Sequence, residues 1–494
     1  MNVILSIDQS TSGTKAILFD LNGNLLDQTS LPHQQFYPQP GWVEHDAEEI
    51  YQNTLKTVKM LLDRNENRSH DIIFLSLTNQ RETAVVFNRD TGNPLYHAIV
   101  WQCRRGTSIC DTLIADRYES FVQQRTGLKI DTYFSASKWK WLIENQPEIS
   151  QKLQDGRALI GTIDTYMIYR LTQGKVFATD HTNASRTLLY NIHNLSWDSD
   201  LCTLFHVPIQ ALPEVRDSNA HYGETDLEGV LTSSIPICGV MGDSQAALFG
   251  QRGYQPGAVK ITIGTGSSIL LNLGSQPKCS NQGLVTAVAW VLDNQPTYCF
   301  EGITNFTGAT INWLRDKLNL ITSPDETESA ALSVEDNGGV YLVNAFVGLS
   351  APYWRPDVRA AILGLTPSST RAHVIRAALE AIAYLTTDIL ESMSREGNVK
   401  LRSIHADGGS TGNRFLMQFM ADMTRLKVRA ANLPELSALG VALAGGLGMG
   451  IFDSLENLQH LPLSFTDYTP VMSYEQSEKL YAGWKHAVKQ VLVR

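Results

Sequence analysis

Two stretches in different halves of the chain carry the same pattern, and this repetition constrains the fold more than any other feature. Residues 5–20 read LSIDQSTSGTKAILFD, and residues 258–273 read AVKITIGTGSSILLNL. In each stretch an extended apolar segment enters a tight turn of hydroxyl side chains and glycine, and a second extended segment leaves it. We therefore expect a duplicated architecture of two lobes, with a cleft between them where small ligands bind.

The segment GQRGYQPGA, which begins at Gly250, concentrates glycine and proline between the two patterns and favours a boundary there. We expect an N-terminal lobe over residues 1–250 and a C-terminal lobe over residues 251–494. Strand patterns alternate with helical periodicity, which begins near residue 105 and is clear from Ile375 to Ile389. The mixture predicts an α/β fold, and a chain of 494 residues is long enough for two large apolar cores.

Charge and hydropathy exclude several classes of partner. The net charge of −10 argues against general binding to nucleic acid or to an anionic membrane surface. An acid at residue 8 interrupts the N-terminal segment, and the apolar stretch from Ala438 is shorter than the roughly 18 residues of a membrane span. Six cysteines without a CxxC spacing indicate neither a zinc site nor disulfides, so we expect a reducing cytoplasm.

The first turn has the composition of a phosphate site. Its backbone N–H groups and the hydroxyls of Thr11 and Ser12 can surround an anion. Asp8 at the mouth of the turn would repel that anion unless a cation such as Mg²⁺ lay between them, and Lys15 offers a further positive charge. The alternative is an ordinary hairpin whose polar side chains face water.

Asp243 follows the buried segment IPICGVMG and opens a helical pattern. It is either a helix N-cap or the base that accepts a hydroxyl proton during phosphoryl transfer, and the two interpretations are compatible. A Walker motif is absent, because Gly174 and Lys175 are followed by valine. Any nucleotide site is therefore of another type.

The segment IHADGGSTGNRF allows two interpretations. Its glycines permit close approach to a ring or a phosphate. Gly408, Ser410 and Gly412 also have the spacing of a hydrolase nucleophile elbow, which would need a histidine and an acid downstream. Only His460 and His486 lie far enough downstream, and neither is in a recognisable motif.

Arg81 and Glu82 lie between two strand patterns, and Trp101 ends a third. Neighbouring opposite charges in a loop usually form a solvated pair of little energetic value. In a pocket, however, they would offer donors and acceptors to vicinal hydroxyls, with Trp101 as an apolar wall.

These pieces, in this order, resemble the FGGY carbohydrate kinases and, within them, the glycerol kinases. The similar segments extend over almost the whole chain and include LTNQRET, AIVWQCRR, GTIDTYMIYRLTQG, TDHTNASRTLLYNIH and YAGWKHAVK. Residues 133–145, YFSASKWKWLIEN, fit the first family signature, and GLTPSSTRAHVIRAALEAIA is similar to the second.

The resemblance implies two actin-like, ribonuclease H-like ATPase lobes with a catalytic cleft between them. It implies ATP and Mg²⁺ as cofactors, with Asp8 and Asp243 at the metal and Asp243 also as the base. The implied ATP-binding residues are Thr11, Ser12, Lys15, Thr265, Gly308, Ile311, Asn312, Gly409 and Asn413, with Lys15 in place of arginine and Asn312 in place of glutamine.

The implied acceptor residues are Arg81, Glu82, Trp101, Tyr133, Asp243, Ser244 and Ser268. Two of them depart from the glycerol kinase pattern, since Ser244 replaces glutamine and Ser268 replaces the phenylalanine that closes the pocket. The overall resemblance favours phosphorylation of glycerol to glycerol 3-phosphate, whereas the altered pocket favours a longer polyol or a ketose. A cleft that binds nucleotide without transfer is a third alternative, and a homo-oligomer is a further expectation.

Overall fold

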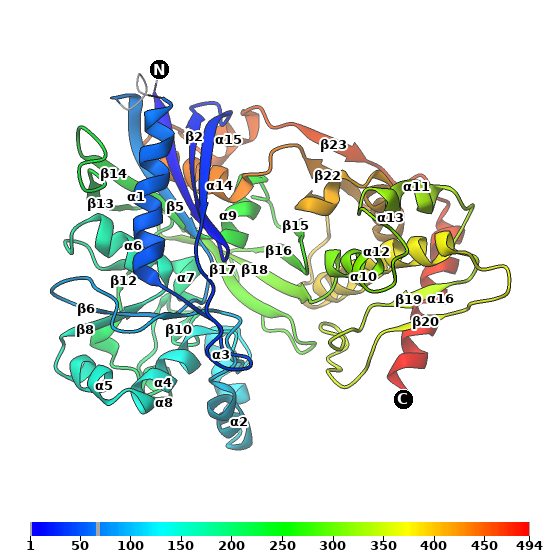
Figure 1. The fold of residues 1–494 in the computed structure, drawn as a ribbon, viewed down its shortest axis with the longest axis horizontal. Coiled ribbons are helices and arrows are strands. Elements are labelled where there is room, and N and C mark those ends of the chain that lie inside the picture. Colours follow the sequence, from blue (N-terminus) through cyan, green and yellow to red (C-terminus); the bar gives the residue numbers. More distant parts are fainter. Residues whose placement is uncertain (1, 66–69, 494) are drawn as a thin grey trace.

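The computed structural model describes residues 2–65 and 70–493, and two β-sheets organise it (Figure 1). The first sheet has six strands in the order β13-β14-β5-β1-β2-β3, and the second has seven in the order β17-β18-β16-β15-β21-β22-β23. The strands of the first sheet are β1 (Val3–Gln9), β2 (Gly13–Asp20), β3 (Leu25–Pro32), β5 (Ile72–Asn79), β13 (His221–Thr225) and β14 (Ile235–Gly242). Those of the second are β15 (Ala258–Ile263), β16 (Ser267–Gly274), β17 (Val285–Leu292), β18 (Gln295–Thr304), β21 (Ser403–Asp407), β22 (Lys427–Ala431) and β23 (Phe465–Tyr468).

The two sheets repeat one topology. In the first, β1, β2 and β3 are antiparallel, β5 and β14 continue the sheet parallel to β1, and β13 closes it antiparallel. In the second, β15, β16 and β18 form the antiparallel part, β21 and β22 run parallel to β15, and β23 is antiparallel. The repeat confirms the α/β architecture of two ribonuclease H-like lobes.

Helices and short strand pairs complete the fold. The helices are α1 (Ala47–Asp63), α2 (Thr107–Ala115), α3 (Glu119–Thr126), α4 (Ser135–Asn145), α5 (Pro147–Gln154), α6 (Ile163–Leu171), α7 (His181–Ala184), α8 (Ser199–Leu204), α9 (Asp243–Gly250), α10 (Gly308–Asp316), α11 (Glu326–Leu332), α12 (Arg371–Gly397), α13 (Arg414–Thr424), α14 (Leu436–Gly448), α15 (Leu455–His460) and α16 (Tyr474–Leu492). The short strand pairs are β4 (Glu44–His45) with β7 (Ala98–Ile99), β6 (Val85–Asn88) with β8 (Ala158–Gly161), β9 (Ala178–Asp180) with β12 (Glu214–Arg216), β10 (Tyr190–Asn191) with β11 (Ser196–Trp197), and β19 (Tyr341–Val343) with β20 (Ala361–Leu363).

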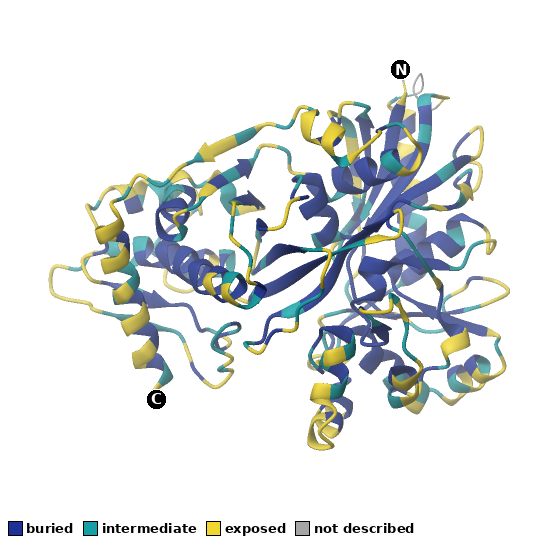
Figure 2. Cartoon of the chain, turned by 180° about the vertical axis from the view of Figure 1, so that it is seen from behind, coloured by how far each residue is buried: buried dark blue, intermediate teal, exposed yellow. Residues whose placement is uncertain are grey.

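Helices cover both faces of the first sheet. Apolar side chains of β1 and β5 pack with α1 and α6 on one face and with α9 and α14 on the other. The second sheet packs against α12 and α13 on one face and turns the other toward α9. In Figure 2 the central strands of both sheets are dark blue and the outer loops are mostly yellow. Apolar side chains of α9 and α14 form one cluster with side chains from strands of both sheets, so these two helices lie between the two buried cores.

The helix α14 comes from the C-terminal half of the chain but packs on the first sheet, beside β14 and α9 (Figure 1). Two of its glycines permit this contact. A Cβ atom at Gly440 would lie 1.9 Å from the carbonyl oxygen of Ala246, and one at Gly445 would lie 2.4 Å from that of Cys238. The apolar stretch from Ala438 is thus the closely packed buried helix that the sequence indicates. The division at residue 250 stays a prediction.

The helical face that the sequence predicts from Ile375 to Ile389 lies on α12. The first of the two repeated patterns forms the hairpin of β1 and β2. All six cysteines carry free thiols. Among the residues that the structure describes, no helix is long and apolar enough to cross a membrane.

A buried histidine pair fixes the connection between β3 and α1. The rings of His33 and His45 lie 4.5 Å apart in an edge-to-face contact, and both side chains are buried. His45 Nε2 contacts Gln35 Oε1 at 2.7 Å, and the Gln35 amide donates to the Thr11 carbonyl in the first turn at 2.8 Å. Burial, with a smaller effect of His33, lowers the pKa of His45 to about 3.

We expect Gly440→Ala to lower the free energy of unfolding by about 1–3 kcal/mol, because the added methyl has no room against the Ala246 carbonyl. Chemical denaturation measures the change. The matched control is Gly412→Ala, where a Cβ would have no atom within 4 Å. Equal stability of the two variants would show that α14 is not closely packed.

We expect acid to destabilise the protein through His45. The unfolded chain binds a proton near pH 6.5, whereas the folded chain keeps His45 neutral until about pH 3, so stability falls as the pH drops below 6.5. Between pH 7 and pH 4 the free energy of unfolding should fall by about 3 kcal/mol through His45, and the His45→Gln variant should lack this decrease. Urea unfolding at pH 7 and at pH 4 measures the decrease, and His193→Gln, at an exposed histidine, is the control. If His45→Gln and the wild type lose the same stability, the attribution is wrong.

Candidate functional site

The carboxyl ends of β1, β5 and β14 meet at one edge of the first sheet. Asp8 is the penultimate residue of β1, opposite Thr78 of β5, and Asp243 directly follows β14. One strand separates the two acids, which corresponds to about 10 Å between their backbones. The structure therefore brings both predicted metal ligands to one edge. Asp243 is the first residue of α9 and Gly242 is its N-cap, so the capping interpretation of Asp243 is not met.

The surroundings of Asp8 favour a cation. Loss of hydration raises the pKa of Asp8 to about 7, against the opposing charge of Lys15 and with further contributions from Asp243 and Glu435. The hydroxyl of Thr78 beside it is buried without a hydrogen-bond partner. Mg²⁺ typically takes one or two protein carboxylates and otherwise water or phosphate oxygens, so these residues fit it. Within the described ranges, no three His, Cys, Asp or Glu side chains converge as a metal cage.

Lys15 is held by a partner that the sequence did not indicate. Its Nζ lies 2.9 and 2.8 Å from the two carboxylate oxygens of Glu435, which is largely buried at the start of α14. Because 420 positions separate the two residues, no local pattern links them. The Ser437 hydroxyl of the same helix donates to the Asp243 carbonyl at 3.0 Å. The end of α14 thus contacts both Lys15 and the strand end at Asp243.

The first turn links the phosphate candidates to the acceptor candidates. Ser10 N–H donates to the Gly13 carbonyl at 2.9 Å and closes the turn, which leaves Ser12 exposed. The Trp101 indole N–H donates to the Thr11 hydroxyl at 3.0 Å. The ring of Trp101 in turn lies 5.3 Å from that of Tyr133. The two aromatic residues therefore form a wall beside the turn.

Arg81 and Glu82 are buried, so the interpretation of a solvated pair is wrong. Glu82 has a φ of 62°, a left-handed conformation that is uncommon outside glycine and clusters at functional sites. Arg81 Nε lies 3.2 Å from Asp243 Oδ1, and its Nη2 lies 2.8 Å from Glu301 Oε1. Arg81 thus connects the end of β14 in the first sheet, through Asp243, with β18 of the second sheet, through Glu301.

A series of five side chains of alternating charge lies between the two lobes: Asp243, Arg81, Glu301, Arg186 and Glu82. Arg186 lies 2.6 Å from both Glu301 and Glu82, and its side chain is fully buried. Burial alone would raise the pKa of Glu301, but Arg186 and Arg81 outweigh it and hold the pKa at about 2. Sequence reasoning did not identify Glu301 or Arg186 as site residues. Arg186 lies in the segment TDHTNASRTLLYNIH, which resembles the family, but only the fold brings the two side chains to Arg81.

The two serines that depart from the family pattern face each other. The Ser244 and Ser268 hydroxyls are 3.4 Å apart, and Ser268 donates to Glu301 Oε1 at 3.3 Å. Both serines are half-buried. The Arg186 guanidinium also lies 5.8 Å from the centre of the Tyr133 ring. Contacts therefore connect all seven acceptor candidates into one network of side chains, although their roles stay predictions.

A second network fixes the backbone before Asp243. The carboxylate of Asp180 caps α7 by accepting from the backbone N–H groups of Thr182 and Asn183. The Thr182 hydroxyl then accepts from Gly242 N–H at 2.8 Å. The amides of Asn183 and Asn79 pair at 2.9 and 3.0 Å at the end of β5. One helical turn therefore holds the ends of β5 and β14.

The second turn stands at the corresponding strand ends of the other sheet. Gly264 N–H donates to the Gly266 carbonyl at 2.9 Å, and α10 begins on this turn through Gly308 N–H to Gly264 O at 2.9 Å. Gly408 follows β21 with a φ of 96°, and a Cβ there would lie 2.5 Å from the Ile263 carbonyl oxygen. Only glycine fits at position 408, because the backbone of Ile263 lies so close to it.

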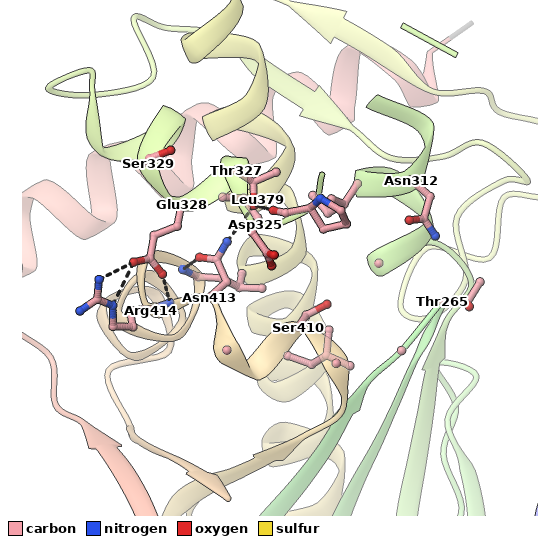
Figure 3. Close-up of a pocket in the computed structure, with 18 of the residues that line it drawn as sticks. Thr265, Asn312, Asp325, Thr327, Glu328, Ser329, Leu379, Ser410, Asn413 and Arg414 are labelled. Carbon is pink, nitrogen blue, oxygen red and sulfur yellow. Dashed lines mark hydrogen bonds and ion pairs between the residues drawn. The ribbon is translucent and has the colours of Figure 1, made fainter. Parts of the chain in front are cut away.

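A cavity of about 750 Å³ opens between these turns and α11 (Figure 3). Asn413 caps α13 and donates to the Thr327 hydroxyl at 3.0 Å, and Arg414 pairs with Glu328 at 2.8 Å on the rim. The cavity lining includes all six nucleotide candidates of the C-terminal half, namely Thr265, Gly308, Ile311, Asn312, Gly409 and Asn413.

Ser410 also lines this cavity, on the short turn Gly409–Gly412. Within residues 2–65 and 70–493, its hydroxyl forms no hydrogen bond with a histidine. His460 ends α15, and His486 contacts Gln490 at 2.9 Å. The geometry gives no support to a hydrolase.

Comparisons with known proteins agree with this geometry. Residues 3–250 match the N-terminal domain of the FGGY family of carbohydrate kinases, and residues 259–449 match its C-terminal domain. The chain is 48% identical to glycerol kinase 1 of Thermotoga maritima over 489 residues, 99% of each chain, and 46% identical to glycerol kinase of Shewanella pealeana over 98% of each.

Solved structures show the same fold. Plasmodium falciparum glycerol kinase with ADP superposes with a TM-score of 0.95 at 37% identity, over 100% of this chain and 99% of that one. A xylulose kinase from Lactobacillus acidophilus gives 0.88 at 19% identity over 100% and 99%, a likeness of fold alone. The chain belongs to the FGGY family of carbohydrate kinases.

Proposed function

We propose that this protein is an ATP-dependent kinase that transfers the γ-phosphoryl group to a hydroxyl of glycerol and forms glycerol 3-phosphate. The observation that carries the proposal is the connected network of side chains from Thr11 to Ser268, which includes the carboxylate of Asp243. The full-length similarity to proteins named glycerol kinase supports the same acceptor. The structural likeness to a glycerol kinase with ADP supports the nucleotide.

ATP would lie across the two turns, with its adenosine in the large cavity. Asp8 and Asp243 would hold Mg²⁺, which offsets charge on the phosphates. Ser12 is exposed toward solvent at the first turn, and its hydroxyl is available to a phosphate. Lys15 would exchange Glu435 for a phosphate oxygen, since both partners are anionic and lie at the same strand ends.

The acceptor would lie between charged and aromatic walls. The guanidinium of Arg81 donates hydrogen bonds and the carboxylate of Glu82 accepts them, so together they suit vicinal hydroxyls. Trp101 and Tyr133 offer apolar faces to the carbon chain. Asp243 lies 3.2 Å from Arg81 and is about 40% exposed, so its carboxylate is accessible to a hydroxyl.

In the mechanism, Asp243 accepts the proton of the attacking hydroxyl. Closure of the lobes excludes water, which would otherwise take the phosphoryl group. The network of Asp180, Thr182 and Gly242 holds the backbone before Asp243 and fixes the base relative to Arg81.

A longer polyol or a ketose is the second candidate acceptor. Ser244 and Ser268 leave two facing hydroxyls where the family pattern has glutamine and phenylalanine. Replacing a phenylalanine wall with serine forfeits roughly 1.5–3 kcal/mol of apolar burial. The extra space and the two hydroxyls suit an acceptor with more hydroxyl groups.

We also propose a cytoplasmic location, which the six free thiols support. A homo-oligomeric state stays a prediction.

We expect Asp243→Asn to lower kcat at least roughly a hundredfold, because general-base catalysis contributes at least that factor. A coupled ADP-release assay over glycerol, tetritols, pentitols and ketopentoses measures it and tests the function itself. Turnover with none of these acceptors would refute the proposed function. Near-wild-type turnover in Asp243→Asn would refute only the role of the base.

We expect Ser268→Phe to raise kcat/KM for glycerol and to lower it for longer polyols. The expected change is about tenfold or more in their ratio, since 1.5–3 kcal/mol of burial corresponds to at least a factor of ten. Ser267→Ala, at the neighbouring position that faces away from Ser268 on β16, is the control. An unchanged ratio in Ser268→Phe would mean that Ser268 does not shape the pocket.

A further inference from the structure

We propose that Glu301 is a positioning residue for the acceptor, which holds Arg81 in its binding orientation from the opposite lobe. This inference rests on the proposed function, because it assumes that Arg81 contacts the acceptor. It concerns a residue of the second sheet that belongs to no motif of the sequence and that contacts Arg81 directly.

Glu301 is the central member of the charge series between the two lobes. Its Oε1 accepts from Arg81 Nη2 at 2.8 Å and from Ser268 at 3.3 Å. Its Oε2 lies 3.3 Å from Arg81 Nη1 and 2.6 Å from Arg186 Nη2. The side chain of Glu301 is 1% exposed, and those of Arg81 and Arg186 are 5% and 0% exposed. One carboxylate therefore pairs with two buried guanidinium groups, each of which has a second acidic partner, Asp243 for Arg81 and Glu82 for Arg186.

This arrangement fixes where Arg81 points. Glu301 holds two nitrogens of its guanidinium, and the third, Nε, faces Asp243 at 3.2 Å. Nη1 also donates to Gln245 Oε1 at 3.2 Å, so Nη2 is the nitrogen that Glu301 holds without Gln245. Such a two-nitrogen contact sets the plane of the group as well as its position. Without the carboxylate of Glu301, Arg81 Nη2 would lose its close anion, and the guanidinium would be free to turn about its contacts with Asp243 and Gln245.

Glu301 also couples the pocket to the relation between the lobes. It lies on β18 of the second sheet, whereas Arg81 follows β5 of the first and Arg186 follows α7. The hydroxyl of Ser268, on the neighbouring strand β16, adds a contact from the same side. The first lobe thus supplies the two arginines, and Glu301 of the second lobe fixes the orientation of their guanidinium groups.

The nucleotide side should be unaffected. The lining of the large cavity includes neither Glu301 nor either arginine. A change in the orientation of the Arg81 guanidinium should therefore raise the KM of the acceptor and leave the KM of ATP unchanged. A purely structural role would lower the amount of folded enzyme and would not change the acceptor KM of the fraction that remains folded.

The test compares Glu301→Gln and Glu301→Asp with the wild type by steady-state kinetics. We expect Glu301→Gln to raise the acceptor KM at least about tenfold, since small misplacements of binding groups cost up to a hundredfold. The KM of ATP should change less than about twofold. Glu301→Asp keeps the charge but not the reach, so its acceptor KM should be intermediate.

Glu380→Gln is the matched control. Glu380 is also a carboxylate buried in the second lobe, 1% exposed, and pairs with Arg376 at 2.8 Å. Its loss should lower the melting temperature and leave the acceptor KM at the wild-type value. A rise in acceptor KM equal to that of Glu301→Gln would assign the effect to general destabilisation and overturn the inference.

A crystal structure of Glu301→Gln, or of Glu301→Asp if the first variant does not fold, gives a readout independent of turnover. We expect the Arg81 guanidinium to leave its wild-type position. An unmoved Arg81, or a wild-type acceptor KM, would overturn the inference even where the wild type is an active kinase. A wild type that phosphorylates no polyol would instead refute the proposed function, and the position of Arg81 would still decide whether Glu301 aims it.

Discussion

The meeting of parallel strand ends at one edge of each sheet is the constraint on which the rest of the structure depends. In the first sheet, β1, β5 and β14 end side by side, and the residues that follow them are the first turn, Arg81 and Asp243. In the second sheet, β15 and β21 end side by side and lead into the second turn and Gly408. Ligands of open α/β sheets bind at such carboxyl ends.

Buried charges lie at this edge of the first sheet. Arg81, Arg186, Glu82 and Glu301 are almost fully buried, a costly arrangement unless each charge has a close partner. Their alternation satisfies that requirement, and it leaves the half-exposed Asp243 at the end of the series. The proposed acceptor site therefore combines buried charges that are held by ion pairs with a carboxylate, that of Asp243, which stays accessible.

The sequence predicts the two lobes and most of the candidate site residues, whereas the residues that it does not predict share a physical reason. The paired hairpins and the apolar periodicity of α12 are local patterns, so they predicted two α/β lobes and their turns. Glu435, Arg186 and Glu301 act through contacts with residues that are more than 100 positions away, and no local pattern reports such contacts. The resemblance located Arg81 and Glu82, whereas their burial and the left-handed backbone of Glu82 became visible only in the fold.

The most direct measurement of the central claim is a crystal structure with a non-hydrolysable ATP analogue, Mg²⁺ and glycerol. The account predicts an acceptor hydroxyl within about 2.6–3.2 Å of the Asp243 carboxylate, the reach of a general base, with the γ-phosphate between the two turns. Glycerol bound away from Arg81 and Asp243, or a nucleotide outside the cavity beside Asn413, would contradict it.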